Sequence, residues 1–440
     1  MLALLAQFLV LAAQLRSCTR RLSHVALHPL RHEGTITRSS RLLVSHVFFA
    51  EPDPMTDPSS TTLQVELDEL APDLRARLDV AGFDRQLLVD LSSTLKGDAT
   101  LRRDTRNRVT GAVSVPRADE ILAAPTWGTP ESERLAALGD AAIARGEVAL
   151  AVMAGGMATR MGGVVKALVP ALGSKTFLDL RLAENATTSK RAKRSVPLWL
   201  MTSDATDAPI RQHLETVAAP EHVRTFVQGL SLRLSPNGLL FRGFDGQPSP
   251  YATGHGDLVA AVRRAGLLRS FRKGGGKYVW IANLDNLGAT IDPAVLGTFI
   301  SSNSDVMVEV CEKAAGDRGG IPVHAQGRLQ VLEEFRLPHR FDATQVRVFN
   351  TNTFLVRADA LETAQIEWNW FEVEKKVDGR AAIQFERLLQ ELTAALAATY
   401  VKVPRHGTSS RFLPVKDHDE LARRRGEIDA VARARGMILS

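Results

Sequence analysis

The chain has 440 residues, of which 45% are hydrophobic, 24% charged and 6% aromatic, an ordinary globular composition with enough apolar mass for a sizeable core. Its two cysteines, Cys18 and Cys311, are too few for a disulfide framework or a cysteine-based zinc site, which favours a reduced compartment such as the cytoplasm. The formal net charge is +6, but residues 1–50 contain six arginines and a single acid, Glu33, so they carry +5 of it. No clustered basic face is left for nucleic acid.

Residues 1–54 begin with an apolar run that is shorter than the ~20 residues of a membrane-spanning helix. A secretory signal places basic residues before its apolar run, whereas here the arginines follow it. We expect residues 1–54 to be a disordered or dispensable tail before a start at Met55, and no membrane partner. A targeting segment and a membrane-associating helix remain as alternatives.

Residues 55–146 are expected to form a helical region that packs on the main domain. The stretches 62–96 and 131–145 have apolar residues at helical spacing behind acidic starts, as in VELDELAPDLRARL.

Residues 147–400 have a different pattern, in which short apolar runs alternate with helical stretches. The runs are VALAVM (148–153), VPLWLMTS (196–203), KYVWIAN (277–283) and DVMVEV (305–310). Fully apolar strands alternating with helices predict an α/β fold with a mostly parallel sheet that is covered on both faces.

The later elements of the chain are less regular. Two strands, RLQVLEEF (328–335) and RVFNTNTFLV (347–356), alternate in polarity and are expected to be antiparallel or peripheral. A helix is expected over 380–397, and a charged surface helix within the C-terminal segment 401–440.

Ligands of open α/β sheets bind at the carboxyl ends of the strands. After the first run comes AGGMATRMGGVVKALVPAL (154–172), read as a glycine-rich strand-to-helix turn. Gly155 and Gly156 allow close backbone approach to a phosphate, and Thr159, Arg160 and Lys166 add a donor and two positive charges. The segment is neither GxGxxG nor GxxxxGK[ST], so dinucleotide-binding and P-loop proteins are disfavoured. A plain tight turn is the alternative.

Asp285 follows the third apolar run. A carboxylate at the end of a buried strand is costly unless it is paired or metal-bound, and Mg²⁺ favours one or two carboxylates together with substrate phosphates. We therefore predict that Asp285 is an Mg²⁺ ligand, with an Asx turn or helix cap as the alternative. The segment Gly254-His255-Gly256-Asp257 precedes a helix, where backbone donors suit an anion or a base edge; a structural histidine is the alternative there.

In their order and spacing, these segments resemble the UDP-glucose pyrophosphorylase (UTP–glucose-1-phosphate uridylyltransferase) family from about residue 148 to Asp417. The matching motifs are GGMATRMGG, GHGDL, NLDNLGATID, GDRGG, VFNTNTFLV, IQFE and SRFLPVK. Within the wider family, DNLGA and FNTN favour the glucose branch over the N-acetylhexosamine branch.

The resemblance implies a Rossmann-like nucleotidyltransferase sheet of the GT-A kind and a set of residue roles. Gly155 and Gly156 would bind the base and phosphates of UTP, and Lys166 and Lys416 its phosphates. Gln228 and Gly254 would read the uracil. His255 would contact the sugar phosphate, Asn283 and Asp285 would hold sugar and Mg²⁺, and Asn352 would bind the hexose with Glu386 nearby.

The chain departs from the family pattern in its glycine-rich segment. Ala158 replaces the third loop glycine, and the spacing from Met161 to Lys166 is one residue shorter than usual, which makes Lys166 a weaker assignment than Lys416. Because the sequence ends at Ser440, we expect no C-terminal β-helix domain and a monomer.

The expected reaction is transfer of UMP from UTP to glucose 1-phosphate, giving UDP-glucose and pyrophosphate. Two alternatives stay open: the same chemistry on another sugar 1-phosphate, and a non-catalytic sensor that binds UTP or a UDP-sugar.

Overall fold

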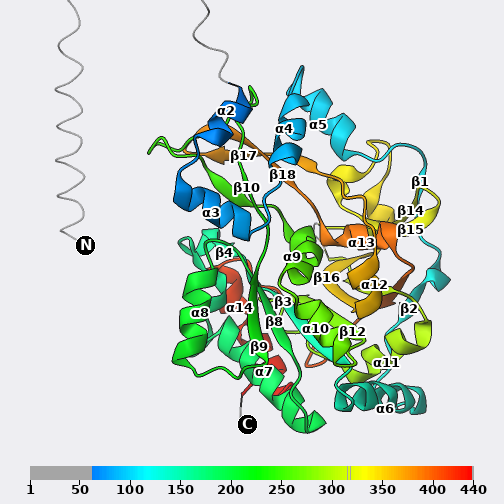
Figure 1. The fold of residues 1–440 in the computed structure, drawn as a ribbon. Helices are drawn as coiled ribbons and strands as arrows, with labels where there is room; N and C mark the ends of the chain where they lie inside the picture. The colour runs from blue at the N-terminus through cyan, green and yellow to red at the C-terminus, as the bar shows by residue number, and fades with distance from the viewer. Residues whose placement is uncertain (1–61, 315, 318, 439–440) are drawn as a thin grey trace, which may run out of the picture. The chain divides into compact units, whose positions relative to one another are not determined.

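A computed structural model describes residues 62–314, 316–317 and 319–438, and the predictions for residues 1–54 lie outside this part. Residues 60–440 form one compact unit (Figure 1). None of the helices in the described part is both long and apolar enough to cross a membrane.

The centre of this unit is an eight-stranded sheet in which only β16 is antiparallel to its neighbours (Figure 1). The predicted mixed, mostly parallel sheet is therefore confirmed. β16 was expected to be antiparallel or peripheral, and it lies antiparallel inside the sheet. In spatial order the strands are β2 (Ile121–Ala123), β19 (Ala398–Lys402), β13 (Val306–Glu312), β16 (Val348–Arg357), β12 (Tyr278–Asn283), β3 (Val148–Met153), β8 (Leu198–Thr202) and β9 (Val223–Val227).

Several helices around the sheet begin at a side chain that accepts backbone N–H groups. Thr176 forms a capping box with Asp179, and Asp292 and Asp417 cap later helices. The helices are α6 (Pro130–Ala144), α7 (Phe177–Ala192), α8 (Asp207–Thr216), α9 (Leu258–Arg264), α10 (Leu267–Lys273), α11 (Pro293–Ser302), α12 (Ala358–Thr363) and α14 (His418–Ala434).

Two glycines bring α6 and α11 into close contact, and the two helices lie side by side in Figure 1. A Cβ atom on Gly139 would lie 2.0 Å from the carbonyl oxygen of Pro293, and one on Gly297 would lie 2.0 Å from that of Leu135. Any larger residue at either position would force the helices apart.

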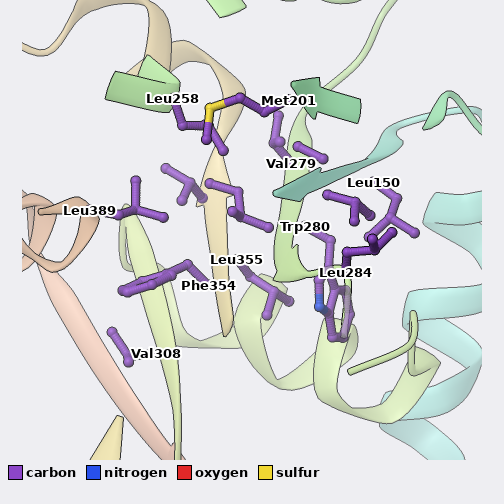
Figure 2. Packing of buried hydrophobic residues seen from close by; sticks show 14 of the residues in the cluster. Leu150, Met201, Leu258, Val279, Trp280, Leu284, Val308, Phe354, Leu355 and Leu389 are labelled. Atoms are coloured by element: carbon purple, nitrogen blue, oxygen red, sulfur yellow. The ribbon is translucent and has the colours of Figure 1, made fainter. Parts of the chain in front are cut away.

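The strands carry the main hydrophobic core, because successive residues of β3 and β12 are buried on both faces of the sheet. Figure 2 shows Leu150, Trp280 and Leu355 from three neighbouring strands packed together. The ring of Trp280 is 1% exposed, and the guanidinium carbon of Arg411 lies 5.2 Å from its centroid. The same strands, β3 and β12, end at the positions where ligands were expected to bind.

The helices predicted over 62–96 and 131–145 are present. Leucines such as Leu67, Leu78 and Leu88 form a second hydrophobic cluster with Leu232 and Phe385. The 55–146 region is not purely helical, since it also contributes β2 to the main sheet. Its further elements are α2 (Leu63–Asp68), α3 (Pro72–Val80), α4 (Arg85–Ser93), α5 (Ala99–Asn107) and β1 (Val113–Ser114), which pairs with β14 (Ile321–Ala325), itself paired with β15 (Arg328–Leu332).

The helix expected over 380–397 is wrong in its first half. β17 (Phe371–Val377) and β18 (Arg380–Glu386) form an antiparallel hairpin, and only the short α13 (Leu392–Ala395) follows it. Asp378 and Gly379 both have positive φ angles, 51° and 74°. This Asp-Gly turn is a strong hairpin signal that outweighs the helical apolar spacing after it.

Candidate active site

A cavity of about 430 Å³ opens at the carboxyl ends of β3, β8 and β12, where parallel α/β sheets bind ligands. The structure brings most of the residues predicted for the site together around this cavity. They are Gly155, Gly156, Lys166, Gln228, Gly254, His255, Asn283, Asp285 and Glu386.

The glycine-rich segment forms a hairpin and not the predicted strand-to-helix turn. β4 (Met157–Ala158) pairs with β5 (Val164–Val165), with Met157 opposite Val165. Gly162 and Gly163, with φ angles of 86° and 73°, turn the chain back. The Lys166 N–H then donates to the Gly156 carbonyl at 3.2 Å. The shortened spacing therefore still returns Lys166 to the cavity.

Thr159 and Arg160 lie in a 3-10 turn at the tip of this hairpin. Both side chains are exposed, and neither lines the cavity. The structure does not bring them to the predicted phosphate site.

The cavity contains an ion pair between Lys166 Nζ and Asp285 Oδ2 at 2.6 Å. The turn that carries Asp285 is braced from below by the buried Arg181, which donates to the carbonyl oxygens of Asn283 and Asn286. The Lys166 ammonium takes one oxygen of this carboxylate and opposes a second positive charge there, so a hard cation would bind through the other oxygen, Oδ1. The described residues contain no cluster of three or more His, Cys, Asp or Glu side chains, so Mg²⁺ would complete its shell with water and substrate phosphates.

Asn352 does not line the cavity, but a β-bulge brings it against Asn283, which does. The pairing of β13 with β16 shifts between Glu309 and Val310, and Asn352 adopts a left-handed φ of 60°. Its side-chain amide donates to Asn283 Oδ1 at 3.1 Å. Its own Oδ1 is buried and has no partner within the described residues. A buried unpaired acceptor at a strained position suggests a ligand donor.

The residues predicted to read the base are closely packed. A Cβ atom on Gly155 would lie 2.7 Å from Gln228 Nε2, so the chain passes close to this amide. Gln228 is 7% exposed, which gives its amide a fixed position. Gly254 has a φ of 93°, and a Cβ atom there would lie 2.5 Å from the Arg387 carbonyl oxygen. Gly254 is therefore required by backbone geometry, whereas a side chain at position 155 would have to displace the Gln228 amide.

His255 is a neutral hydrogen-bond donor in this site. Burial lowers the pKa of His255 to about 4. The Leu389 N–H donates to its Nδ1 at 3.0 Å, so the proton of the neutral ring is on Nε2. On the same wall, Glu386 accepts a hydrogen bond from Gln384.

Lys416 is exposed and does not line the cavity. Its segment is nevertheless attached to the Asp285 turn. The Asn286 side chain donates to the Arg411 carbonyl at 3.0 Å and accepts from the Leu413 N–H at 2.7 Å. The structure thus brings the lysine's backbone segment, but not its side chain, to the site.

Sequence reasoning missed the residues that brace the site, namely Arg181, Asn286 and Arg411. Arg411 is 2% exposed and pairs with Glu309 at 2.6 Å. Arg181 had a usable signal, since it is a single arginine among the apolar residues of TFLDLRLAENA. Asn286 had none, because its partners are more than a hundred residues away in the sequence.

Comparison with known proteins gives one family. Residues 116–428 match the family described as UTP–glucose-1-phosphate uridylyltransferase. A protein of that name from Musa acuminata is 32% identical over 62% of this chain, and one from Pyrus pyrifolia is 32% identical over 61%. These matches cover 62% and 59% of those relatives, so the chain spans about three fifths of their length.

Solved structures give the fold. A UDP-glucose phosphorylase of Trypanosoma brucei aligns with a TM-score of 0.65 at 19% identity, covering 80% of this chain and 77% of its own. A uridine diphosphate N-acetylglucosamine pyrophosphorylase of the same organism aligns with a TM-score of 0.62 at 21% identity, covering 80% and 83%. The two scores are close, so the fold alone does not separate glucose from N-acetylglucosamine.

Proposed function

The chain belongs to the UTP–glucose-1-phosphate uridylyltransferase family, and on this basis we propose that it transfers UMP from UTP to glucose 1-phosphate. The products are UDP-glucose and pyrophosphate. The observation that carries the proposal is the cavity in which Lys166 and Asp285 form an ion pair beside a neutral histidine and two asparagine amides. That set combines phosphate-binding charge with groups that bind a sugar and a base.

In the proposed reaction, an oxygen of the sugar 1-phosphate attacks the α-phosphorus of UTP. A new P–O bond forms, the bond to the β-phosphate oxygen breaks, and pyrophosphate leaves. The attacking oxygen is already a nucleophile near pH 7, so no general base is required. The remaining task is to bring polyanions together, and catalysis is then mostly positioning and charge neutralisation.

Each side chain has a part in this scheme. Lys166 binds phosphate oxygens of UTP, and the His255 Nε2–H donates to the sugar phosphate. Asp285 would hold Mg²⁺, which would neutralise charge on the phosphates. Gln228 has both a donor and an acceptor for the uracil edge, and Asn283 and Asn352 face the hexose. Lys416 supplies a second positive charge if its side chain turns toward the cavity when substrates bind.

The experiment is a pyrophosphate-release assay across nucleotides and sugar 1-phosphates. We expect turnover with UTP and glucose 1-phosphate, and little with CTP or ATP. A preference for galactose 1-phosphate or N-acetylglucosamine 1-phosphate would replace glucose by another sugar. UTP binding without pyrophosphate release would establish the sensor instead.

Lys416→Ala and Asp285→Ala test the residue roles. Loss of one such electrostatic group typically costs about a hundredfold or more in kcat. Lys175→Ala, at an exposed strand position outside the cavity, is the matched control. Wild-type turnover in Lys416→Ala or Asp285→Ala would remove that residue from the mechanism.

We further propose that the protein acts in the cytoplasm as a monomer. The buried free thiol of Cys311 supports a reducing location. Cell fractionation and sedimentation of the purified protein test the two statements.

A further inference from the structure

Asp257 lies directly behind the cavity and has no role in the scheme above. It ends the short helical turn His255–Asp257 that leads into α9, and it is 0% exposed. A carboxylate without access to water is costly unless its partners are well placed. The partners of Asp257 therefore indicate why it is present.

Its two oxygens bind two chain segments that each carry a lining residue of the cavity. One accepts the backbone N–H of Gly229, the residue after Gln228. The other accepts the guanidinium of Arg387, the residue after Glu386. One carboxylate thus fixes both the predicted base-reading residue and the predicted hexose-side residue.

The surrounding turn leaves little room for adjustment. A Cβ atom on Gly229 would lie 2.5 Å from Asp257 Oδ2, and one on Gly256 would lie 2.7 Å from the Leu388 backbone nitrogen. The Gly256 N–H donates to the Arg387 carbonyl at 3.0 Å. The backbone at Gly256 therefore packs directly on the backbone of residues 387–388. We infer that a movement of the Asp257 carboxylate would move both Gly229 and Arg387.

Arg387 is itself held in place. Its guanidinium carbon lies 4.8 Å from the ring centroid of Trp370, and its side chain is 15% exposed. Without the Asp257 charge, this guanidinium would be left partly buried with no counterion among the contacts described here.

We propose that Asp257 is a positioning residue that sets the distance between the base-binding and hexose-binding walls, and thereby the preference for UTP. The inference rests on the proposed function, and it assigns nucleotide selectivity to a group that does not touch the substrate.

The test compares the ratio of kcat/KM for UTP to that for CTP in the wild type and in Asp257→Asn. The asparagine keeps an acceptor for Gly229 but loses the charge facing Arg387. We expect the ratio to fall by about tenfold or more, because a misplacement of ~1 Å in a binding group costs on the order of a hundredfold in rate. An unchanged ratio overturns the proposal.

Glu147→Gln is the matched control. Glu147 is also a buried carboxylate, 6% exposed, and it pairs with Lys277 at 2.6 Å and Arg145 at 2.8 Å. It lies at the amino end of β3, on the opposite edge of the sheet from the cavity. We expect both variants to melt at lower temperature, and only Asp257→Asn to lose selectivity. An equal loss of selectivity in Glu147→Gln would reduce the effect to general destabilisation and overturn the proposal.

Arg387→Gln and the double variant complete the test. If the two residues act as one unit, the double variant loses no more selectivity than Asp257→Asn alone, whereas additive losses contradict the proposal. If Asp257→Asn does not fold, Arg387→Gln provides the test. An unchanged ratio of kcat/KM for UTP to that for CTP in this variant overturns the proposal.

A failure of the proposed reaction can be distinguished from a failure of the inference about Asp257. If the wild type releases no pyrophosphate, calorimetric affinities for UTP and CTP replace the kinetic ratio. A wild type that binds UTP no better than CTP overturns the inference as well.

Discussion

At the scale of single residues, His255 in the cavity titrates at a lower pH than an exposed histidine. The pKa of His255 is lowered from 6.5 to about 4 by burial, so the ring is neutral across the physiological range. Between these two values, the unfolded chain holds a proton that the folded chain does not. The contribution of His255 to stability is therefore fully present above pH 6.5 and is lost as the pH falls toward 4.

We predict that His255→Gln weakens the acid sensitivity of folding. Urea unfolding at pH 7.5 and pH 5 should show a smaller loss of stability in the variant than in the wild type. His406→Gln, at an exposed position, is the control and should behave as the wild type. The same loss in His255→Gln and wild type would mean that burial of this ring does not drive the effect.

A substitution at Asn352 can separate an effect on hexose binding from an effect on folding. Asn352→Gly keeps the left-handed backbone at low cost and removes the amide that meets Asn283. We expect kcat/KM for glucose 1-phosphate to fall about fivefold, the equivalent of one hydrogen bond of ~1 kcal/mol, with KM for UTP unchanged.

The control is Asn303→Gly, which replaces another left-handed asparagine, with a φ of 54°, at the end of α11. It should leave both kinetic constants unchanged. A rise in KM for UTP in Asn352→Gly, or equal effects at the two positions, would contradict the assignment to the hexose.

Among residues, the sequence identified those that line the cavity better than those that support them. Asp285 could be recognised because it follows an apolar run, whereas Gln228 was assigned from the family resemblance. Asn286 and Asp257 could not be assigned roles, because their partners are distant in sequence and a buried support is recognisable only with its partners in view.

At the scale of elements, the connection between the Asp285 turn and the segment before α14 is central to the site. Asn286 alone makes two hydrogen bonds across it, to Arg411 and Leu413. Both backbone partners belong to buried residues, and the segment leads directly to Lys416.

We predict that Asn286→Ala lowers the free energy of unfolding by at least about 2 kcal/mol, since each unsatisfied buried group costs about 1–3 kcal/mol. We also expect kcat to fall toward that of Lys416→Ala, because the lysine loses its anchor. Urea unfolding and steady-state kinetics measure the two effects. Asn237→Ala, in an exposed turn, is the control. If Asn286→Ala is destabilised but its kcat is unchanged, the hydrogen bonds of Asn286 contribute to stability and not to catalysis.

Element prediction succeeded where the apolar pattern was long and failed at turns. The buried strands β3, β8, β12 and β13 follow from their apolar runs. The hairpins β4–β5 and β17–β18 were missed because each depends on two positive-φ residues, which local hydrophobic spacing does not register.

At the scale of the whole molecule, we expect that folding does not depend on the proposed Mg²⁺. The described residues contain no group of three or more His, Cys, Asp or Glu side chains that could hold one. We predict that EDTA abolishes pyrophosphate release while leaving the melting temperature unchanged, and that added Mg²⁺ restores activity. Full turnover in EDTA would refute the proposed metal role of Asp285.

The class of sheet could be predicted from the sequence, but not its strand order. Apolar strands alternating with helices predict parallel neighbours, whereas the position of β19 between β13 and β2 depends on the pairing of Ile121 with Tyr400, which are distant in the sequence. The predicted site residues lie around one cavity because they follow the carboxyl ends of strands that were themselves well predicted.

The position of β19, the last of the strands in chain order, between β13 and β2 has a consequence for biosynthesis. β2 is made early and β13 in the later part of the chain, yet within the described sheet both wait for residues 398–402 to fill the space between them. A nascent chain or fragment that stops before β19 therefore presents two open strand edges, and open edges are templates for pairing with other chains. We therefore expect truncated chains that lack residues 398–402 to aggregate more readily than the full chain.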